Sequence, residues 1–175
     1  MKAELEILVN EELHRRVLVE TLEDASRYVW IATANVKDIR VSRGRGYVSA
    51  LDRLAKLTKR GVRIRMLHAG VPSKAFWESF HRQPELASGY LEMQQCRRVH
   101  FKTIIVDGTV AYMGSANFTG AGMGARRAAA RNFELGILTS HPSVVRALAD
   151  VFDRIWMGLS CPGCALRERC TDPMA

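Results

Sequence analysis

Two runs rich in strand-forming residues, 100–106 and 110–115, flank an Asp-Gly pair at positions 107 and 108. An Asp-Gly pair between two apolar runs is a strong signal for a β-hairpin. Two more short runs of this kind, 90–96 and 133–139, lie on either side of the hairpin. The close spacing of these four strands indicates that they pair directly with one another.

The remainder of the chain follows a different pattern, in which helical and strand-like segments alternate. Apolar residues recur there at either helical or alternating spacing. Helices are expected over 11–26, 48–60, 73–80 and 143–156, and strands over 28–36 and 62–68. Alternation followed by direct strand pairing predicts an α/β fold, with a mixed β-sheet flanked by helices.

The hairpin also carries a group of polar residues that suits phosphate chemistry. His100 and Lys102 are two residues apart on an expected strand, so they share one face. A neutral imidazole is a competent nucleophile near neutral pH, and an ammonium stabilises the negative charge of a phosphoryl-transfer transition state. Ser115 and Asn117 offer neutral donors for phosphate oxygens, and the small Gly114 would let a phosphate approach the backbone.

The order His-x-Lys, four residues, Asp107, six residues and Gly-Ser-x-Asn resembles the HKD motif of the phospholipase D superfamily. Every motif position is filled, and the resemblance covers best the stretch 96–135. It implies a phospholipase D-like catalytic domain over residues 1–158. It also implies a phosphodiesterase in which the motif histidine, His100, attacks phosphorus and forms a phosphohistidine.

The resemblance assigns roles to the other motif positions. Lys102 and Asn117 would hold the phosphate, and Ser115 would assist them. Asp107 is interpreted as structural, gripping the hairpin backbone rather than touching substrate. Glu134 lies in a segment similar to the one whose Glu hydrogen-bonds a motif His, so it would orient the imidazole. The other four histidines have no such context and are interpreted as structural: His14, His68, His81 and His141.

The chain contains one His-x-Lys motif, whereas the chemistry needs two protonatable groups. One histidine attacks phosphorus, and a second protonates the leaving oxygen. Small endonucleases of the superfamily meet this need by dimerising, so we expect a homodimer with a two-fold axis through the site. No metal ion is expected in catalysis, because Lys102 and its symmetry mate supply the positive charge.

The formal net charge of +8 favours a polyanionic partner, with nucleic acid, most readily DNA, as the expected substrate. Arginines in loops or beside the motif would line the backbone groove: Arg40, Arg43, Arg45, Arg97, Arg98, Arg126, Arg127 and Arg131. Two alternatives stay open. One is a phospholipid phosphodiesterase, which the lack of an amphipathic membrane element disfavours. The other is a non-catalytic nucleic-acid-binding module within a larger complex.

A cytoplasmic location is expected, with no membrane partner. The N-terminal residues are acidic where a signal peptide would be basic and then apolar. No apolar run approaches the roughly 20 residues that a membrane span requires. Both observations agree with a protein that works inside the cell.

Three of the four cysteines, Cys161, Cys164 and Cys170, crowd into the tail 159–175, which is expected to pack on the same domain. A Cys-x-x-Cys pair with a third cysteine nearby is typical of a metal site, with Cys96 as the fourth ligand. The expected cofactor is structural zinc or a 4Fe–4S cluster. The tail spacing resembles the cluster-binding cysteines of the iron–sulfur exonucleases of CRISPR adaptation and bacterial helicase–nucleases. Free thiols or a disulfide remain the alternative.

Overall fold

The computed structural model describes residues 4–43 and 46–174 and contains one large mixed sheet. Its strand order is β1-β9-β8-β7-β2-β5-β6, and β3 and β4 form a separate hairpin. The strands span Leu5–Val9 (β1), Tyr28–Thr33 (β2), Arg40–Arg43 (β3), Gly46–Ser49 (β4), Arg63–His68 (β5), Leu91–Gln95 (β6), Lys102–Val106 (β7), Val110–Gly114 (β8) and Leu135–Thr139 (β9).

The direction of the strands changes at the centre of the sheet. β2, β5 and β6 run parallel, joined by helical connections, whereas β7, β8, β9 and β1 pair antiparallel. The join is the antiparallel pair β2–β7, in which Val29 lies opposite Val106 and Ala32 opposite Thr103. The predicted α/β fold with a mixed sheet flanked by helices is therefore confirmed.

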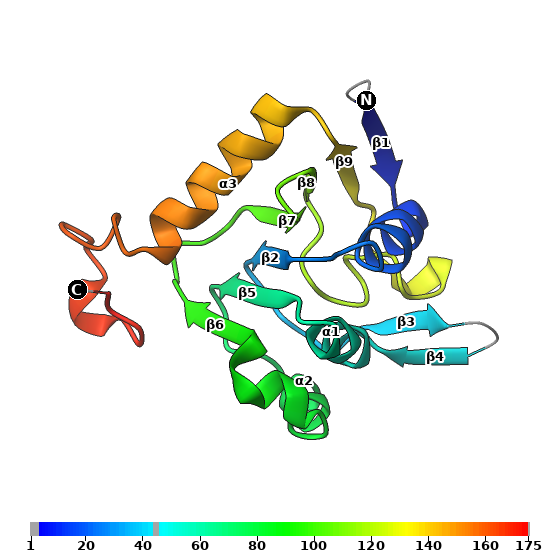
Figure 1. Cartoon of the computed structure of the whole chain (residues 1–175), viewed down its shortest axis with the longest axis horizontal. Helices are drawn as coiled ribbons and strands as arrows, with labels where there is room; N and C mark the ends of the chain where they lie inside the picture. Colours follow the sequence, from blue (N-terminus) through cyan, green and yellow to red (C-terminus); the bar gives the residue numbers. More distant parts are fainter. Residues whose placement is uncertain (1–3, 44–45, 175) are drawn as a thin grey trace.

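Helices cover both faces of the sheet (Figure 1). One face packs against α1 (Ala50–Lys59), α2 (Lys74–His81) and a wide helical segment, Leu13–Thr21, whereas α3 (Pro142–Trp156) packs on the other face. Ser49 starts α1 with a capping box that includes Asp52. Further short helical turns are Leu86–Tyr90, Ala128–Ala130 and Arg167–Arg169. Among the described residues, no helix combines the length and hydropathy that a bilayer span requires.

Two elements differ from the sequence prediction. β1 was not expected, although its Leu8 is fully buried under the Leu13–Thr21 segment. The segment with Arg40, Arg43 and Arg45, where the sequence suggested a loop, is instead partly a hairpin, in which Val41 of β3 pairs with Val48 of β4. The apolar side chain of Val41 is buried, which favours a strand over a solvated loop. Of the arginines expected there, Arg45 lies outside the described residues.

Helix α3 covers only part of its sheet face and leaves a set of apolar side chains exposed. Register places Ile7, Ile137 and Met113 side by side on this face, with Val9 opposite Leu135. The exposed members form what we call the apolar patch: Leu5, Ile7, Val9, Met113, Phe133 and Leu135. Phe133, in the segment before β9, is 97% exposed. Large exposed apolar sets of this kind typically mark a protein interface.

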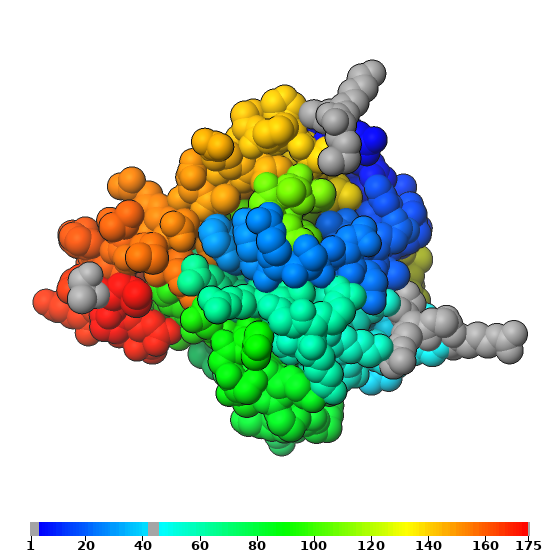
Figure 2. All heavy atoms as spheres, viewed as in Figure 1, coloured from blue at the N-terminus to red at the C-terminus, as the bar shows by residue number. Residues whose placement is uncertain are grey.

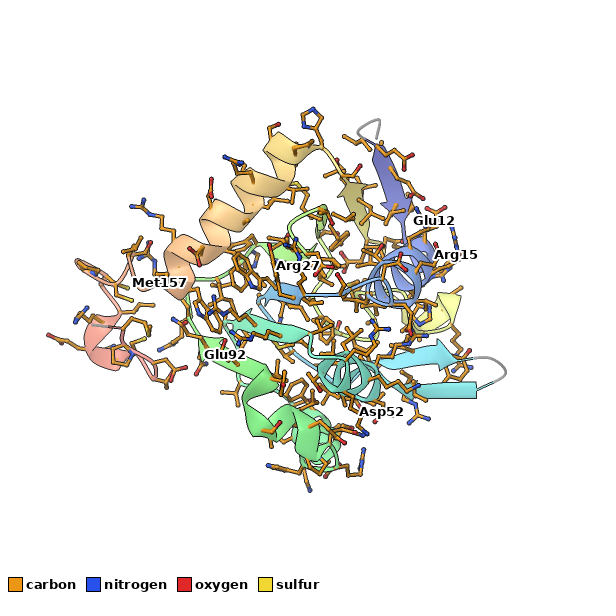
Figure 3. All side chains as sticks on the ribbon, viewed as in Figure 1. Glu12, Arg15, Arg27, Asp52, Glu92 and Met157 are labelled. Carbon is orange, nitrogen blue, oxygen red and sulfur yellow. The ribbon has the colours of Figure 1, made fainter. Side chains whose placement is uncertain are left out.

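The Asp107 carboxylate fastens the turn between β7 and β8 to the start of β2. One oxygen accepts the backbone N–H groups of Arg27 and Tyr28, each at 2.8 Å. The other accepts the backbone N–H of Ser26 at 2.8 Å and its hydroxyl at 2.7 Å. Arg27, labelled in Figure 3, also donates to the Asp107 backbone carbonyl. Asp107 therefore has a structural role, gripping β2 rather than its own hairpin.

Burial opposes ionisation of Asp107, but the hydrogen bonds from Tyr28, Ser26 and Arg27 outweigh it and hold its pKa below the ordinary 3.8. A carboxylate with a lowered pKa stabilises the folded state above its unfolded pKa. That stabilisation is lost as the pH falls below 3.8 and through the lower pKa of the folded protein.

We expect Asp107→Asn to lower the free energy of unfolding by about 2–3 kcal/mol at pH 7, because charged hydrogen bonds are replaced by weaker or mismatched ones. Asn tolerates the positive φ of 54° at this position, so backbone strain does not contribute. Urea unfolding at pH 7 and near pH 3 measures the effect, which should shrink at the lower pH. Asp150→Asn, at an exposed position on α3, is the matched control. A loss that is equal at both pH values would contradict this account.

Candidate active site

The polar residues of the motif gather at one edge of the sheet. This edge contains the carboxyl end of β2 at Thr33, the start of β7 at Lys102, and Asn117 just beyond β8. β7 runs antiparallel to β2, so its first residue lies beside the last residues of β2. The fold thereby brings together residues that are more than 80 positions apart in the sequence.

His100 and Lys102 are adjacent, although not in the way that the spacing predicts. β7 begins at Lys102, so His100 precedes the strand and is exposed. The Lys102 ammonium is almost buried, donates to the His100 backbone carbonyl at 2.6 Å, and lies 3.4 Å from the imidazole Nδ1. A positive charge thus sits beside an imidazole that faces solvent. The anchored lysine also fixes the backbone from which the histidine projects.

Asn117 is held by the end of β2. Its side-chain oxygen accepts the backbone N–H groups of Ala34 and Asn35, both at 3.1 Å. The buried Thr33 hydroxyl adds a contact to the same chain segment by accepting the Phe118 backbone N–H at 2.9 Å. Among the described residues, no hydrogen bond uses the Asn117 amide N–H₂, which can therefore donate to a ligand. The sequence prediction missed Thr33 and Asn35, whose only signal is their position at the end of a buried strand.

Ser115 and Glu134 form a separate pair beside the motif. The Ser115 hydroxyl donates to one Glu134 carboxylate oxygen, and Asn132 donates to the other at 3.0 Å. Ser115 also accepts the Leu135 backbone N–H at 3.1 Å. Within the described part of the chain, no hydrogen bond joins Glu134 to His100. The expected role of Glu134 in orienting the imidazole therefore stays a prediction.

Close packing explains why position 114 is a glycine, which the sequence did not reveal. A Cβ atom at this position would lie 2.5 Å from the Tyr112 hydroxyl and 2.6 Å from the Leu135 carbonyl oxygen. Gly136 on the neighbouring strand faces the same tyrosine ring. The two glycines make room for the fully buried Tyr112, and this burial raises the pKa of the phenol. Close packing therefore accounts for Gly114 without invoking a bound phosphate.

His68 ends β5 at the same edge of the sheet, as a buried residue. Its Nδ1 atom lies 2.9 Å from the Gly70 carbonyl oxygen. Burial lowers the pKa of its imidazole, so the neutral form is favoured. These contacts agree with the structural interpretation of His68.

The arginines that the sequence suggested for a groove differ in their surroundings. Arg131 is mostly buried and pairs with Glu11 at 2.6 Å, so its charge is already compensated. Arg97, Arg126 and Arg127 are exposed. Arg98 is exposed as well, and its hydrogen bond to Cys164 raises the pKa of its guanidinium. Arg126 and Arg127, which follow the motif, are thus better placed for phosphates than Arg131.

The four cysteines are free thiols that line one pocket at the end of α3. The tail returns to the sheet there, because the Gln95 backbone N–H donates to the Asp172 carboxylate at 2.7 Å. Hydrogen bonds from the Leu166 backbone N–H and the Arg98 guanidinium lower the pKa of the Cys164 thiol. Figure 2 shows the tail lying against α3 and β6 rather than extending away from the domain.

Comparisons with known proteins agree with this arrangement. Residues 18–156 match the family described as cardiolipin synthase, PLD-like domain. No curated protein sequence matches the chain. The fold is similar to that of Nuc from Salmonella typhimurium, a phospholipase D family member, with 16% identity over 89% of this chain and 95% of that one and a TM-score of 0.67.

Two further solved structures share the fold. NucT from Helicobacter pylori is 13% identical over 87% of this chain and 95% of that one, with a TM-score of 0.60. The archaeal chromatin protein TrmBL2 is 18% identical over 87% of this chain and 51% of that one, with a TM-score of 0.57. With most of its length matched by the family and its motif residues gathered at one edge of the sheet, the chain belongs to the phospholipase D superfamily and is a phosphodiesterase of that superfamily.

Proposed function

We propose that this protein cleaves nucleic acid, most readily DNA, as a homodimer in which His100 is the nucleophile and no metal ion takes part. The observation that carries the proposal is the exposed imidazole of His100 beside the anchored ammonium of Lys102. Each chain supplies this pair once. A complete acid–base site therefore needs a second copy.

The reaction would proceed in two displacements. A neutral His100 attacks phosphorus and forms a P–N bond, while the ester P–O bond breaks and the leaving oxygen takes a proton from the partner subunit's His100. That second imidazole then removes a proton from water, which attacks phosphorus, breaks the P–N bond and releases a phosphate monoester. Lys102 and the Asn117 amide would stabilise the charge on the non-bridging oxygens in both steps.

The apolar patch supports a second copy of this chain as the partner. Leu135 of the patch pairs directly with Ser115, so the patch extends along the sheet up to the motif. Met113 lies two residues before Ser115 on the same face. A two-fold axis through the site, with the patches of two copies in contact beside it, would bring the two copies of the motif together, which the chemistry requires.

Charge and the comparisons favour nucleic acid as the substrate. The chain carries a net charge of +8, and the exposed Arg126 and Arg127 follow the motif. Polyphosphate backbones bind such surfaces by releasing counterions. TrmBL2, which shares the fold, is a DNA-binding chromatin protein. The matching family is described by a lipid enzyme, cardiolipin synthase, so a phospholipid is the alternative substrate to test.

We expect His100→Ala to reduce plasmid cleavage by about 10³-fold or more, because the nucleophile is lost. His81→Ala, at an exposed site on α2, should cleave like the wild type. Cleavage should persist in EDTA, because Lys102 supplies the charge that a metal ion would otherwise provide. A gel assay on plasmid, single-stranded DNA and RNA, with and without EDTA, measures the effects of both substitutions and of EDTA.

The outcomes of this assay separate the alternatives. Cleavage that EDTA abolishes while the circular dichroism spectrum is unchanged would overturn the metal-free mechanism. Binding of DNA without cleavage by either protein would favour a non-catalytic module. Release of headgroups from phospholipid vesicles, with no cleavage of nucleic acid, would identify a phospholipid as the substrate.

Subunit mixing tests whether two His100 residues form one site. When equal amounts of wild type and His100→Ala are unfolded and refolded together, about one quarter of the dimers hold two His100 residues. Activity per wild-type chain should then fall to about half. Activity per wild-type chain that does not change on mixing would mean that one His100 is enough.

Placing a charge in the apolar patch should separate the subunits. Ile7 is 62% exposed in the chain, so Ile7→Asp should fold normally yet sediment as a monomer and lose cleavage. Tyr47→Asp, at an equally exposed position on β4, should keep the dimer mass. Analytical ultracentrifugation gives the masses. A wild-type chain that cleaves DNA while sedimenting as a monomer would exclude the dimeric site.

A further inference from the structure

All four cysteines of the chain line the same pocket, although they come from separate places in the sequence. Cys96 follows β6, Cys161 and Cys164 follow α3, and Cys170 lies near the end of the described chain. The catalytic residues described above take no part in this pocket. Its convergence of thiols therefore needs an explanation of its own.

Polar contacts hold the tail over this pocket and give it a defined shape. The Asp172 carboxylate accepts the Gln95 backbone N–H at 2.7 Å, and the Thr171 hydroxyl donates to the Gln95 side chain at 2.7 Å. Arg167 donates to the Met174 carbonyl at 3.3 Å. The tail, residues 159–175, follows the end of α3, where Met157 is labelled in Figure 3. Its Asp172 contact brings it back to β6.

The turn containing Cys161 and Cys164 brings their backbones close. The Cys164 backbone N–H donates to the Cys161 carbonyl at 3.1 Å, and Gly163 between them has a φ of +72°. This is a left-handed conformation that favours glycine over other residues. The Cys-Pro-Gly-Cys sequence thus forms a tight turn, and both of its cysteines line the pocket.

The size of the pocket decides what it can hold. Its volume is about 160 Å³, whereas a cavity of roughly 10–15 Å³ is enough for one water and about 150 Å³ holds a benzene molecule. Across the described residues, no three His, Cys, Asp or Glu side chains are arranged to hold a single metal ion. Four cysteines that line a space of this size can hold a polynuclear group, in which each thiolate binds a different metal atom.

We propose that the four cysteines bind a 4Fe–4S cluster. In such a cluster each thiolate ligates a different iron, so the ligands stand around the group rather than converging on one atom. A zinc ion would need the four sulfurs about 2.3 Å from a common centre. Arg98 and Arg167 also line the pocket, and their positive charges suit the net negative charge of a cluster with four thiolate ligands.

The cluster would join the tail to the segment that carries the candidate nucleophile. Cys96 precedes His100 by four residues, and the Val99 backbone N–H closes a turn on the Cys96 carbonyl at 2.9 Å. Val99 is buried among apolar side chains that include Phe152 of α3. The role of the 4Fe–4S cluster is therefore structural, because it would hold the tail and residues 96–100 together at the edge of the sheet.

The test uses the full chain, produced with added iron and purified without oxygen. We expect a brown protein that absorbs at about 400 nm and contains about four iron and four sulfide ions per chain. Cys96→Ser, Cys161→Ser, Cys164→Ser and Cys170→Ser should each lose most of the iron and the absorption band. Ser160→Ala, which changes a neighbouring residue in the same pocket, should keep both.

Other results would overturn the proposal. One zinc per chain without iron would assign the thiols to a single ion, and a metal-free wild type would leave them as thiols. Iron that remains after the cysteine substitutions would place it elsewhere. If a serine variant fails to fold, the stoichiometry, the spectrum and the electron paramagnetic resonance signal of the reduced wild type decide the matter. These readouts are independent of cleavage, so they do not depend on the proposed nuclease activity.

Discussion

The arrangement of the candidate site depends on the hydrogen bonds between the Asp107 carboxylate and the start of β2. They fix one end of the β2–β7 pair, with Val29 opposite Val106, and so set the register to the other end, where Ala32 meets Thr103. Side chains alternate along a strand, so a slip of one residue would turn Lys102 to the opposite face of the sheet. Asp107, at the far end of β7 from His100, thus determines on which face of the sheet the Lys102 ammonium lies.

The sequence predicted the fold and the position of the hairpin better than the geometry of the candidate site. The α/β fold, the hairpin at Asp107 and the gathering of His100, Lys102 and Asn117 follow from strand spacing and motif order. The partners that hold Asn117 were not predictable, because Ala34 and Asn35 reach it only through the β2–β7 pairing. The start of β7 was also misplaced by two residues, since the last pairing in the ladder, Lys102 with Gly114, depends on β8.

Packing also explains features that the sequence assigned to function. Gly114 was interpreted as an opening for phosphate, but Tyr112 and the Leu135 carbonyl fill the space beside it. Arg131 was counted among the groove arginines, but Glu11 binds it. In both cases a deciding neighbour, Leu135 for Gly114 and Glu11 for Arg131, lies far away in the sequence. Local patterns identify which residue types are present, whereas long-range contacts determine which of them remain available to a ligand.

The apolar patch sets an energetic scale for the proposed dimer. Six side chains from each of two subunits would leave water, and after partial burial each contributes about 1 kcal/mol, or about 12 kcal/mol together. Association costs about 4–15 kcal/mol in lost translational and rotational freedom. Apolar burial alone therefore roughly offsets that cost, and polar contacts across the two-fold axis must supply the rest. A substrate phosphate held by both copies of Lys102 would add such contacts, so nucleic acid should tighten the dimer that acts on it.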